Sequence, residues 1–300
     1  MKKTSRTWDL ISFNIIAYTM IVGFSILCVL PFVMMFSGSI SSSRSIVING
    51  YTLWPREFSL DAYEVLFNEP EIMLKSFNVS VIVTFAGTLL SLFICSMAGY
   101  AMVRKNFRAR NKVAFFYYFT TLFSGGLVPY YIVMINYYGM KNNILALILP
   151  ATINVWNLLV LRNFMKNNVP EALIESAKID GAGEFRIYAN IVIPLMVPAL
   201  MAIGFFTAIG YWNDWYSAML FIEKESIIPL QYKLYKMLNT MNTLAQIAAR
   251  SKNPKIAKMQ LPTETIKLAM AVTAAAPIIF LYSFIQKYFV KGIMVGAVKG

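Results

Sequence analysis

The chain has 300 residues, of which 58% are hydrophobic and only 14% are charged. Soluble domains carry about a quarter charged residues, so this composition excludes an ordinary soluble protein and indicates an integral membrane protein surrounded by lipid. The formal net charge is +13, and the chain contains no histidine. Basic loops on the cytoplasmic side of a membrane account for such a charge, which therefore requires no nucleic-acid partner.

Six apolar segments are each long enough to cross about 30 Å of hydrocarbon as a helix. They cover residues 14–36, 77–103, 113–135, 144–161, 189–212 and 268–286. We therefore expect an all-α integral membrane protein with six transmembrane helices. Its membrane domain would cover residues 14–290, with a cytoplasmic tail over 1–13 and a second cytoplasmic tail over 291–300.

Lysine and arginine are distributed unevenly between the two sides of these segments. The tails and two of the loops carry Lys2, Lys3, Arg6, Arg104, Lys105, Arg108, Arg110, Lys112, Arg162, Lys166, Lys178, Arg186, Lys287, Lys291 and Lys299. The two shorter loops on the opposite side carry only Arg44, Arg56, Lys75 and Lys141. Because cytoplasmic loops are enriched in basic residues, we expect both termini in the cytoplasm and the long loop 213–264 outside.

The third apolar segment is interrupted by the sequence Ser124-Gly125-Gly126-Leu127-Val128-Pro129. Glycine and proline break helices, and a broken helix at membrane depth is tolerated only where protein or a water-filled cavity lies beside it. A cavity wall and a purely structural kink are both open interpretations of this break.

The fourth segment carries two amides, Asn154 and Asn157, with Trp156 between them. Residues three positions apart share one face of a continuous helix, and amides at membrane depth need hydrogen-bond partners. Bonding to a neighbouring helix is one interpretation. Lining a sugar path is the other, because amides and an aromatic face suit hydroxyl groups and C–H surfaces.

The polar stretch between the fourth and fifth segments predicts a short helix. Pro170 suits a first helical turn, and Glu171 complements the positive end of the helix dipole. Asp180-Gly181 should end the helix, since glycine tolerates the left-handed conformation of a C-cap. Glu175 and Lys178 are spaced as an i,i+3 ion pair. A helix this short is marginal in water, so we expect it to pack against a partner.

The outer boundary of the fifth segment carries Trp212, Asn213 and Asp214 within a cluster of aromatic residues. An ordinary aromatic belt at the membrane interface and a gate or substrate contact at the external mouth are both open interpretations. In the following loop, Leu230, Leu234, Met237, Leu238 and Met241 form an apolar helical stripe, with Lys233 and Lys236 outside it. These charges fit a solvated face or a docking surface for an external protein.

Several function classes lack their motifs in this sequence. There is no G-x-x-x-x-G-K-[ST] loop, so we expect no ATP site, and no cofactor, on this chain. We see no nucleophile-and-base pair and no cluster with metal-ligand spacing, so we expect neither an enzyme nor a metal site. The acidic residues all lie outside the six segments, which argues against a proton-driven carrier.

One motif in the polar stretch is specific. Glu175-Ser176-Ala177, Gly181, Ile191 and Ile193-Pro194 resemble the E-A-A, three residues, G, nine residues, I-x-L-P signature of permease subunits from binding-protein-dependent ABC importers. Ser176 and Ile193 depart from it by small or isosteric changes. The flanking residues 179–182 and the W-N-D triplet at 212–214 are similar to the carbohydrate branch of that family. The chain looks like the smaller permease subunit of maltose-type transporters.

The resemblance implies a type I ABC importer permease fold in a bacterial plasma membrane, and oligosaccharide import by alternating access. It implies that the loop 163–188 is a cytoplasmic coupling loop that sits in a groove of a separate ATPase. Glu171, Glu175 and Asp180 would then offer carboxylates to basic groups of that ATPase. Ala177 would allow close approach, and Gly181 would form the turn.

The partners implied by the resemblance are a second homologous permease subunit, two copies of an ABC ATPase that bind ATP and magnesium, and an extracellular or periplasmic sugar-binding protein. Two alternatives stay open. The same importer could carry a solute other than a sugar, because the coupling loop reports on the motor and not on the cargo. The chain could also be a channel or carrier that works without ATP.

Overall fold

The computed structural model describes the backbone of residues 3–250 and 263–297, and the side chains of residues 8–248, 250 and 264–286. Within these residues the chain is helical apart from its connections and one isolated β-bridge between Ser41 and Phe58, which confirms the all-α prediction. Part of the predicted outer loop, 251–262, and the end of the predicted C-terminal tail, 298–300, lie outside the described residues.

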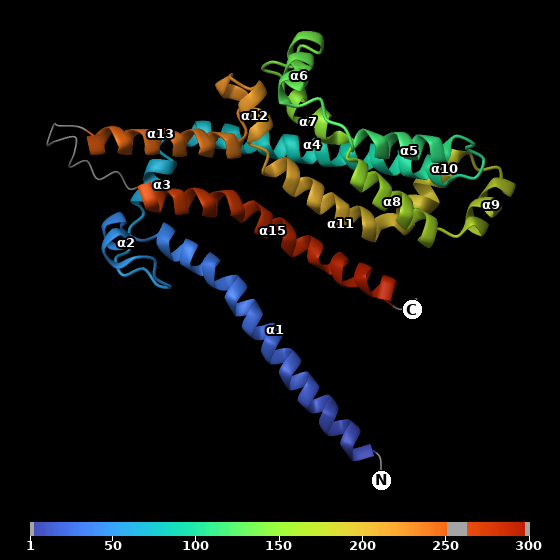
Figure 1. Ribbon diagram of the computed structural model, residues 1–300, viewed down its shortest axis with the longest axis horizontal. Coiled ribbons are helices and arrows are strands. Elements are labelled where there is room, and N and C mark those ends of the chain that lie inside the picture. Colours follow the sequence, from blue (N-terminus) through green and yellow to red (C-terminus); the bar gives the residue numbers. More distant parts are fainter. Residues whose placement is uncertain (1–2, 251–262, 298–300) are drawn as a thin grey trace. The chain divides into compact units, whose positions relative to one another are not determined.

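Figure 1 shows the helices in chain order. Their bounds are α1 Lys3–Ser39, α2 Ser43–Asn49, α3 Asp61–Leu66, α4 Pro70–Val103, α5 Arg110–Thr120, α6 Leu127–Ile132, η1 Val133–Tyr137, α7 Leu145–Thr152, α8 Val155–Asn168, α9 Glu171–Ile179, α10 Glu184–Ile187, η2 Tyr188–Val192, α11 Ile193–Trp212, α12 Tyr216–Phe221, η3 Glu225–Ile227, α13 Leu230–Arg250 and α15 Thr263–Ala297. The described residues form two compact units, one up to residue 70 together with 237–276, and one over 71–236 together with residues from 277 onward.

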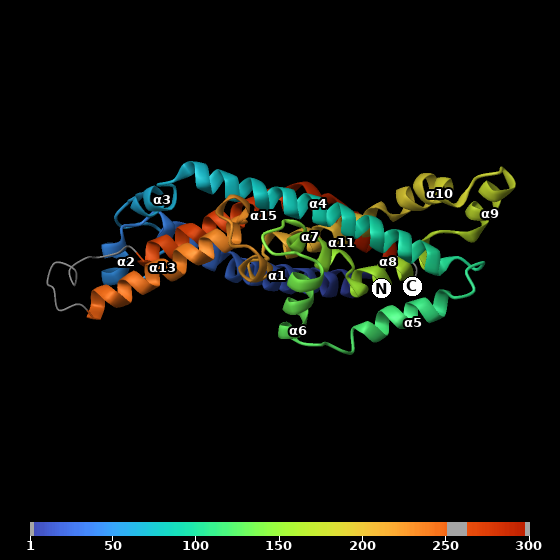
Figure 2. The same cartoon turned by 90° about the horizontal axis from the view of Figure 1, so that it is seen from above.

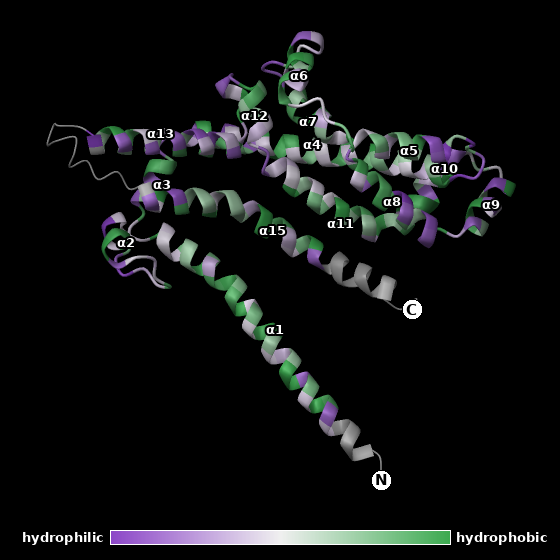
Figure 3. Cartoon of the chain, viewed as in Figure 1, coloured by the Kyte–Doolittle hydropathy of each residue, from purple (hydrophilic) through white to green (hydrophobic). Residues whose placement is uncertain are grey.

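Among the described residues, four helices are long and apolar enough to cross a membrane. These candidate spans are Trp8–Ser39, Pro70–Val103, Glu184–Trp212 and Glu264–Gln286. In Figure 3, α1 is largely hydrophobic, whereas α13 carries many hydrophilic residues. The helices α7 and α8 meet the same criteria together, with a bend of 47° between them, and would make a fifth span.

The predicted third span is broken where the sequence indicates a break. The helix α5 ends at Thr120, and Gly126 precedes α6 with a φ of 84°, a left-handed value that favours glycine. Pro129 lies in the first turn of α6, where its missing N–H leaves no hydrogen bond unmade. Neither α5 nor α6 alone is long enough to span a membrane, so a crossing by this segment requires more than one helix.

In the second unit, α4 contacts α10, η2 and α11 through particular side chains. A Cβ on Gly87 of α4 would meet the ring of Tyr211, and a Cβ on Gly204 of α11 would meet Leu92. Small residues let helices approach in this way within a membrane, where no hydrophobic effect drives them together. The Tyr211 hydroxyl donates to the Ile148 carbonyl oxygen at 2.9 Å, which ties this contact to α7.

A substitution at Gly87 tests this close approach. In Gly87→Ala, the new Cβ would lie 2.6 Å to 2.8 Å from ring carbons of Tyr211, and such overpacking costs about 1–3 kcal/mol. Gly210→Ala is the matched control, because nothing lies within 4 Å of its added Cβ and alanine favours a helix over glycine by about 0.5–1 kcal/mol. Thermal unfolding of the purified protein should place Gly87→Ala below the unsubstituted chain and Gly210→Ala at or above it. Equal melting temperatures for the two variants would contradict the packing described.

Candidate functional site

The polar stretch folds as a helical hairpin made of α9 and α10. The helix α9 spans Glu171–Ile179, as predicted, with Pro170 at its N-cap. The turn after it depends on Gly181, whose φ is 77°, and the Ala182 N–H donates to the Ala177 carbonyl at 2.8 Å. The predicted turn at Gly181 is therefore present. In Figures 1 and 2, α9 and α10 lie together at one end of the second unit.

One face of α9 is packed and the other is open. Ile174 is buried in the core formed with α4, α8 and η2, and Ala177 packs against the edge of this core. The opposite side exposes Leu173 and Ile179, the latter at 87%. The following helix α10 exposes Phe185 at 66%. Exposed apolar side chains on a polar rim are typical of a surface that binds another protein.

The charges of the hairpin divide into paired and unpaired groups. Glu171 forms an ion pair with Lys105, which follows the end of α4. Among the described residues, no ion pair involves the carboxylates of Glu175 and Asp180, and both residues are exposed. Ala177 and Asp180 also line a cavity of about 210 Å³. Two free carboxylates therefore lie on the open side of the hairpin.

The predicted ion pair between Glu175 and Lys178 is wrong. The Lys178 ammonium lies 2.7 Å from the Glu184 carboxylate instead. An exposed i,i+3 pair contributes only about 0.2–0.5 kcal/mol, whereas Glu184 also accepts from the Tyr100 hydroxyl at 2.6 Å and lies 3.4 Å from Arg104 Nε. Charge and hydrogen bonding thus converge on Glu184. Sequence reasoning missed this residue, and its only local signal is an acidic side chain in the first turn of a helix.

The two asparagines do not share a helical face, because the fourth segment breaks between α7 and α8. Asn154 is the N-cap of α8, and its Oδ1 accepts from the Asn157 N–H at 3.1 Å. Asn157 Nδ2 donates to Thr207 Oγ1 of α11 at 3.1 Å. The prediction of a continuous helix is therefore wrong here, since a capping side chain starts a new helix within the apolar run. Capping and interhelical bonding account for both amides, and a role in a sugar path stays a prediction.

The outer triplet is spread over three different environments. Trp212 is 6% exposed and packs edge-on against Phe77, with ring centroids 5.8 Å apart. Asn213 is exposed, and its Oδ1 accepts from Gln231 Nε2 at 3.4 Å. Asp214 Oδ1 accepts from the Ser217 N–H at 3.0 Å, at the start of α12. Of the three residues, only Asn213 is open to solvent, and a gate at this position stays a prediction.

The predicted apolar stripe lies on α13, further along the loop that follows this triplet. Leu230 and Leu234 are buried, whereas Lys233, expected to be solvated, is only 17% exposed and pairs with Glu225 at 3.3 Å. Lys236 lies 2.7 Å from the same carboxylate, and this hydrogen bond holds the pKa of Glu225 below its usual value. The carboxylate therefore stays ionised and neutralises part of the basic charge of this loop.

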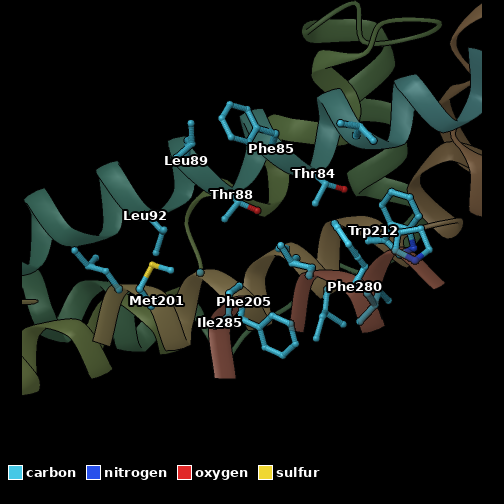
Figure 4. A pocket seen from close by; sticks show the side chains of 18 residues that line it. Thr84, Phe85, Thr88, Leu89, Leu92, Met201, Phe205, Trp212, Phe280 and Ile285 are labelled. Atoms are coloured by element: carbon cyan, nitrogen blue, oxygen red, sulfur yellow. The ribbon is translucent and has the colours of Figure 1, made fainter. Parts of the chain in front are cut away.

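A cavity of about 500 Å³ lies between α4, α11 and the part of α15 that begins at Pro277. Figure 4 shows its apolar walls, with Phe85, Leu89, Phe205 and Phe280 among them. Within the described residues, the hydroxyls of Thr84 and Thr88 are buried without a hydrogen-bond partner. Walls so poor in polar groups suit hydrocarbon better than a hydroxyl-rich sugar, because sugar hydroxyls need partners when they are desolvated.

Substitutions at Asn154 test directly whether its side chain caps α8. Asn154→Ala removes the acceptor for the Asn157 N–H and should lower the free energy of unfolding by about 1 kcal/mol. Asn154→Asp keeps an acceptor and should stay near the unsubstituted value. Unfolding of both purified variants, followed by tryptophan fluorescence, gives the comparison. The capping role is refuted if alanine and aspartate give the same stability.

Comparisons with known proteins agree with this architecture. Residues 5–295 match the family model described as "Binding-protein-dependent transport system inner membrane component". The chain is 37% identical to the polygalacturonan/rhamnogalacturonan transport system permease protein YtcP of Bacillus subtilis (strain 168), over 96% of this chain and 98% of the relative. It is 34% identical to the protein LplC of the same organism, over 93% of this chain and 92% of the relative.

A solved structure is similar over almost the whole chain. It is the crystal structure of a bacterial ABC transporter involved in the import of the acidic polysaccharide alginate. The TM-score is 0.76 at 26% identity, covering 96% of this chain and 99% of that chain. One conclusion follows from these comparisons, since the family model covers nearly the full length, two relatives exceed 30% identity and the fold is shared. The chain belongs to the binding-protein-dependent transport system inner membrane components, the permease subunits of ABC importers, and is a multi-pass protein of the bacterial plasma membrane.

Proposed function

We propose that this chain is one of two permease subunits of an ATP-driven importer, and that the loop 163–188 couples it to a separate ATPase. The observation that carries the proposal is the open side of the α9 hairpin. It presents apolar side chains, among them Ile179 at 87% exposure, next to carboxylates that have no ion pair in the described chain. A groove with apolar walls and basic residues would bury both kinds of group at once.

The roles of the hairpin residues follow from this geometry. Glu175 and Asp180 offer free carboxylates to basic groups of the ATPase. Glu171 does the same at the N-terminus of α9, where it exchanges or shares its contact with Lys105. Ala177, small and partly buried, lets the ATPase approach the helix closely, and Gly181 holds the turn in a conformation that other residues adopt only with strain.

The membrane arrangement that we propose has six spans with both termini in the cytoplasm. The four long helices supply four spans, the bent pair α7 and α8 supplies a fifth, and the broken segment from α5 to η1 supplies the sixth. The basic residues that flank these elements support this orientation, because Lys and Arg concentrate in cytoplasmic loops. The α9 hairpin then faces the cytoplasm, where an ATPase is available.

The transport cycle needs partners for the steps that this chain does not perform. A second homologous permease would form the other wall of the path, and two ATPase copies would bind ATP and magnesium. An external or periplasmic binding protein would deliver the solute. Closure of the ATPases would pull the coupling loops together and switch the path from one side of the membrane to the other.

The cargo that we propose is an oligosaccharide, and an acidic one in particular. The support comes from the relatives named for polygalacturonan and alginate, both polymers of sugar acids. Asn154, Asn157 and the triplet 212–214 are the candidate path residues, and of these Asn154 and Asn213 are exposed.

Uptake by membrane vesicles that contain the complete importer would test the cargo. We expect oligogalacturonates or alginate oligosaccharides to be taken up in an ATP-dependent way, and neutral malto-oligosaccharides of equal length to compete poorly. Uptake of the neutral sugars alone would refute the acidic cargo while leaving the importer assignment in place.

The coupling loop is tested by Glu175→Lys and Gly181→Val. Both should leave membrane insertion intact, because positions 175 and 181 are exposed and lie outside the core, and both should separate ATP hydrolysis from sugar uptake. Glu64→Lys, an exposed acidic position on α3, is the matched control and should transport normally. Transport and ATPase activity are measured on the same vesicles. Normal uptake by well-expressed Glu175→Lys and Gly181→Val variants would show that the loop does not couple.

A further inference from the structure

The two oxygens of the Glu184 carboxylate contact side chains from two different helices. Oε1 lies 2.7 Å from the Lys178 ammonium, at the end of α9. Oε2 accepts from the Tyr100 hydroxyl of α4 at 2.6 Å and lies 3.4 Å from Arg104 Nε. Hydrogen bonds to an ionised group are shorter and stronger than those between neutral groups. One side chain on α10 thus joins the coupling helix to the cytoplasmic end of a transmembrane helix.

A second contact lies one turn further along the same pair of elements. The Tyr188 and Ser96 hydroxyls are 2.6 Å apart, and the rings of Tyr188 and Tyr100 are 5.6 Å apart. Ser96 and Tyr100 are four residues apart on α4. Glu184 of α10 and Tyr188 of η2 are also four residues apart, so the two contacts lie one helical turn from each other. Two contacts one turn apart fix both the spacing and the rotation of the facing helices, whereas a single contact would not fix both.

Buried side chains surround these two contacts, which favours rigid transmission of a helix movement. Ile187, between Glu184 and Tyr188, is fully buried, and Tyr100 and Tyr188 are also buried. The other polar link from α9 to the region of α4, the Lys105–Glu171 pair, is exposed on both sides, and exposed pairs are weak because water and salt screen them. The Lys178–Glu184 pair is also open to water, with side chains 33% and 53% exposed. Glu184 differs from Glu171 because its second oxygen has largely buried partners, the Tyr100 hydroxyl and the Arg104 side chain at 14% exposure.

We infer that Glu184 is a positioning residue that transmits movement of the coupling helix α9 to the transmembrane helix α4. The inference rests on the proposed function, because it requires an ATPase that moves α9. Glu184 itself contacts neither ATP nor cargo in this account. It holds Lys178 and Tyr100 at a fixed separation, so that a displacement of α9 becomes a displacement of α4.

The experiment follows α4 directly and needs no cargo. A reporter cysteine, Ala101→Cys, is placed at the exposed cytoplasmic end of α4, in a chain with Cys28 and Cys95 replaced by alanine. The complete importer is purified through a tag on this chain and reconstituted in lipid vesicles. The labelling rate of the reporter by a water-soluble maleimide is compared with and without ATP, magnesium and vanadate, which trap the closed ATPase.

In the unsubstituted background we expect trapping to change the labelling rate by about fivefold or more, the range of an allosteric coupling. In Glu184→Gln and in Lys178→Gln this change should be lost, while the ATPase still co-purifies, because the open face of α9 is untouched. Glu184→Asp keeps the charge and should restore part of the response. Lys112→Gln, an exposed position on α5 outside the loop 163–188, is the matched control and should respond fully.

A full response in both Glu184→Gln and Lys178→Gln would overturn the inference, as would an equal loss in Lys112→Gln. If Glu184→Gln is not recovered folded, Lys178→Gln decides, because it removes only the α9 side of the contact. Failure of the proposed function has a different signature. In that case the unsubstituted chain retains no ATPase and shows no response to trapping.

Discussion

The side-chain contacts that join α4 to α10, η2 and α11 are the constraint on which the second unit depends. At one end it requires glycine at position 87, because the ring of Tyr211 occupies the space of a side chain. At the other end polar groups take over, with Ser96 and Tyr100 bonded to Tyr188 and Glu184. Small residues bring the helices together, and hydrogen bonds then fix their register. The hairpin that carries the candidate coupling residues is attached to this rigid pair.

The α9 hairpin combines a fixed base with an open face. Its base is held by Ile174 in the core and by Lys178 through Glu184. Its open face leaves apolar and acidic groups in contact with water, an arrangement that contributes nothing to the stability of an isolated chain. Exposed apolar groups rimmed by polar ones are typical of a surface that another protein covers. The proposed function assigns this face to an ATPase with a complementary groove.

Helix bounds and breaks could be predicted from the sequence wherever nearby residues determine them. The bounds of α9 follow from Pro170 and Gly181, and the break before α6 follows from paired glycines. Prediction was wrong or silent where a distant residue decides. The apolar run over 144–161 concealed the break at Asn154, because its composition resembles one continuous span. The Glu184 contact was missed because its partner Tyr100 lies 84 residues earlier in the chain, a pairing that local spacing does not encode.

The central claim is that the open face of α9 binds an ATPase, and the most direct measurement is gentle affinity purification of the tagged chain from native membranes. Mass spectrometry then identifies whatever remains attached. The account predicts recovery of a second permease together with an ABC ATPase. Recovery of the unsubstituted chain as a stable protein without any ATPase would contradict the account and favour a channel or carrier that works without ATP.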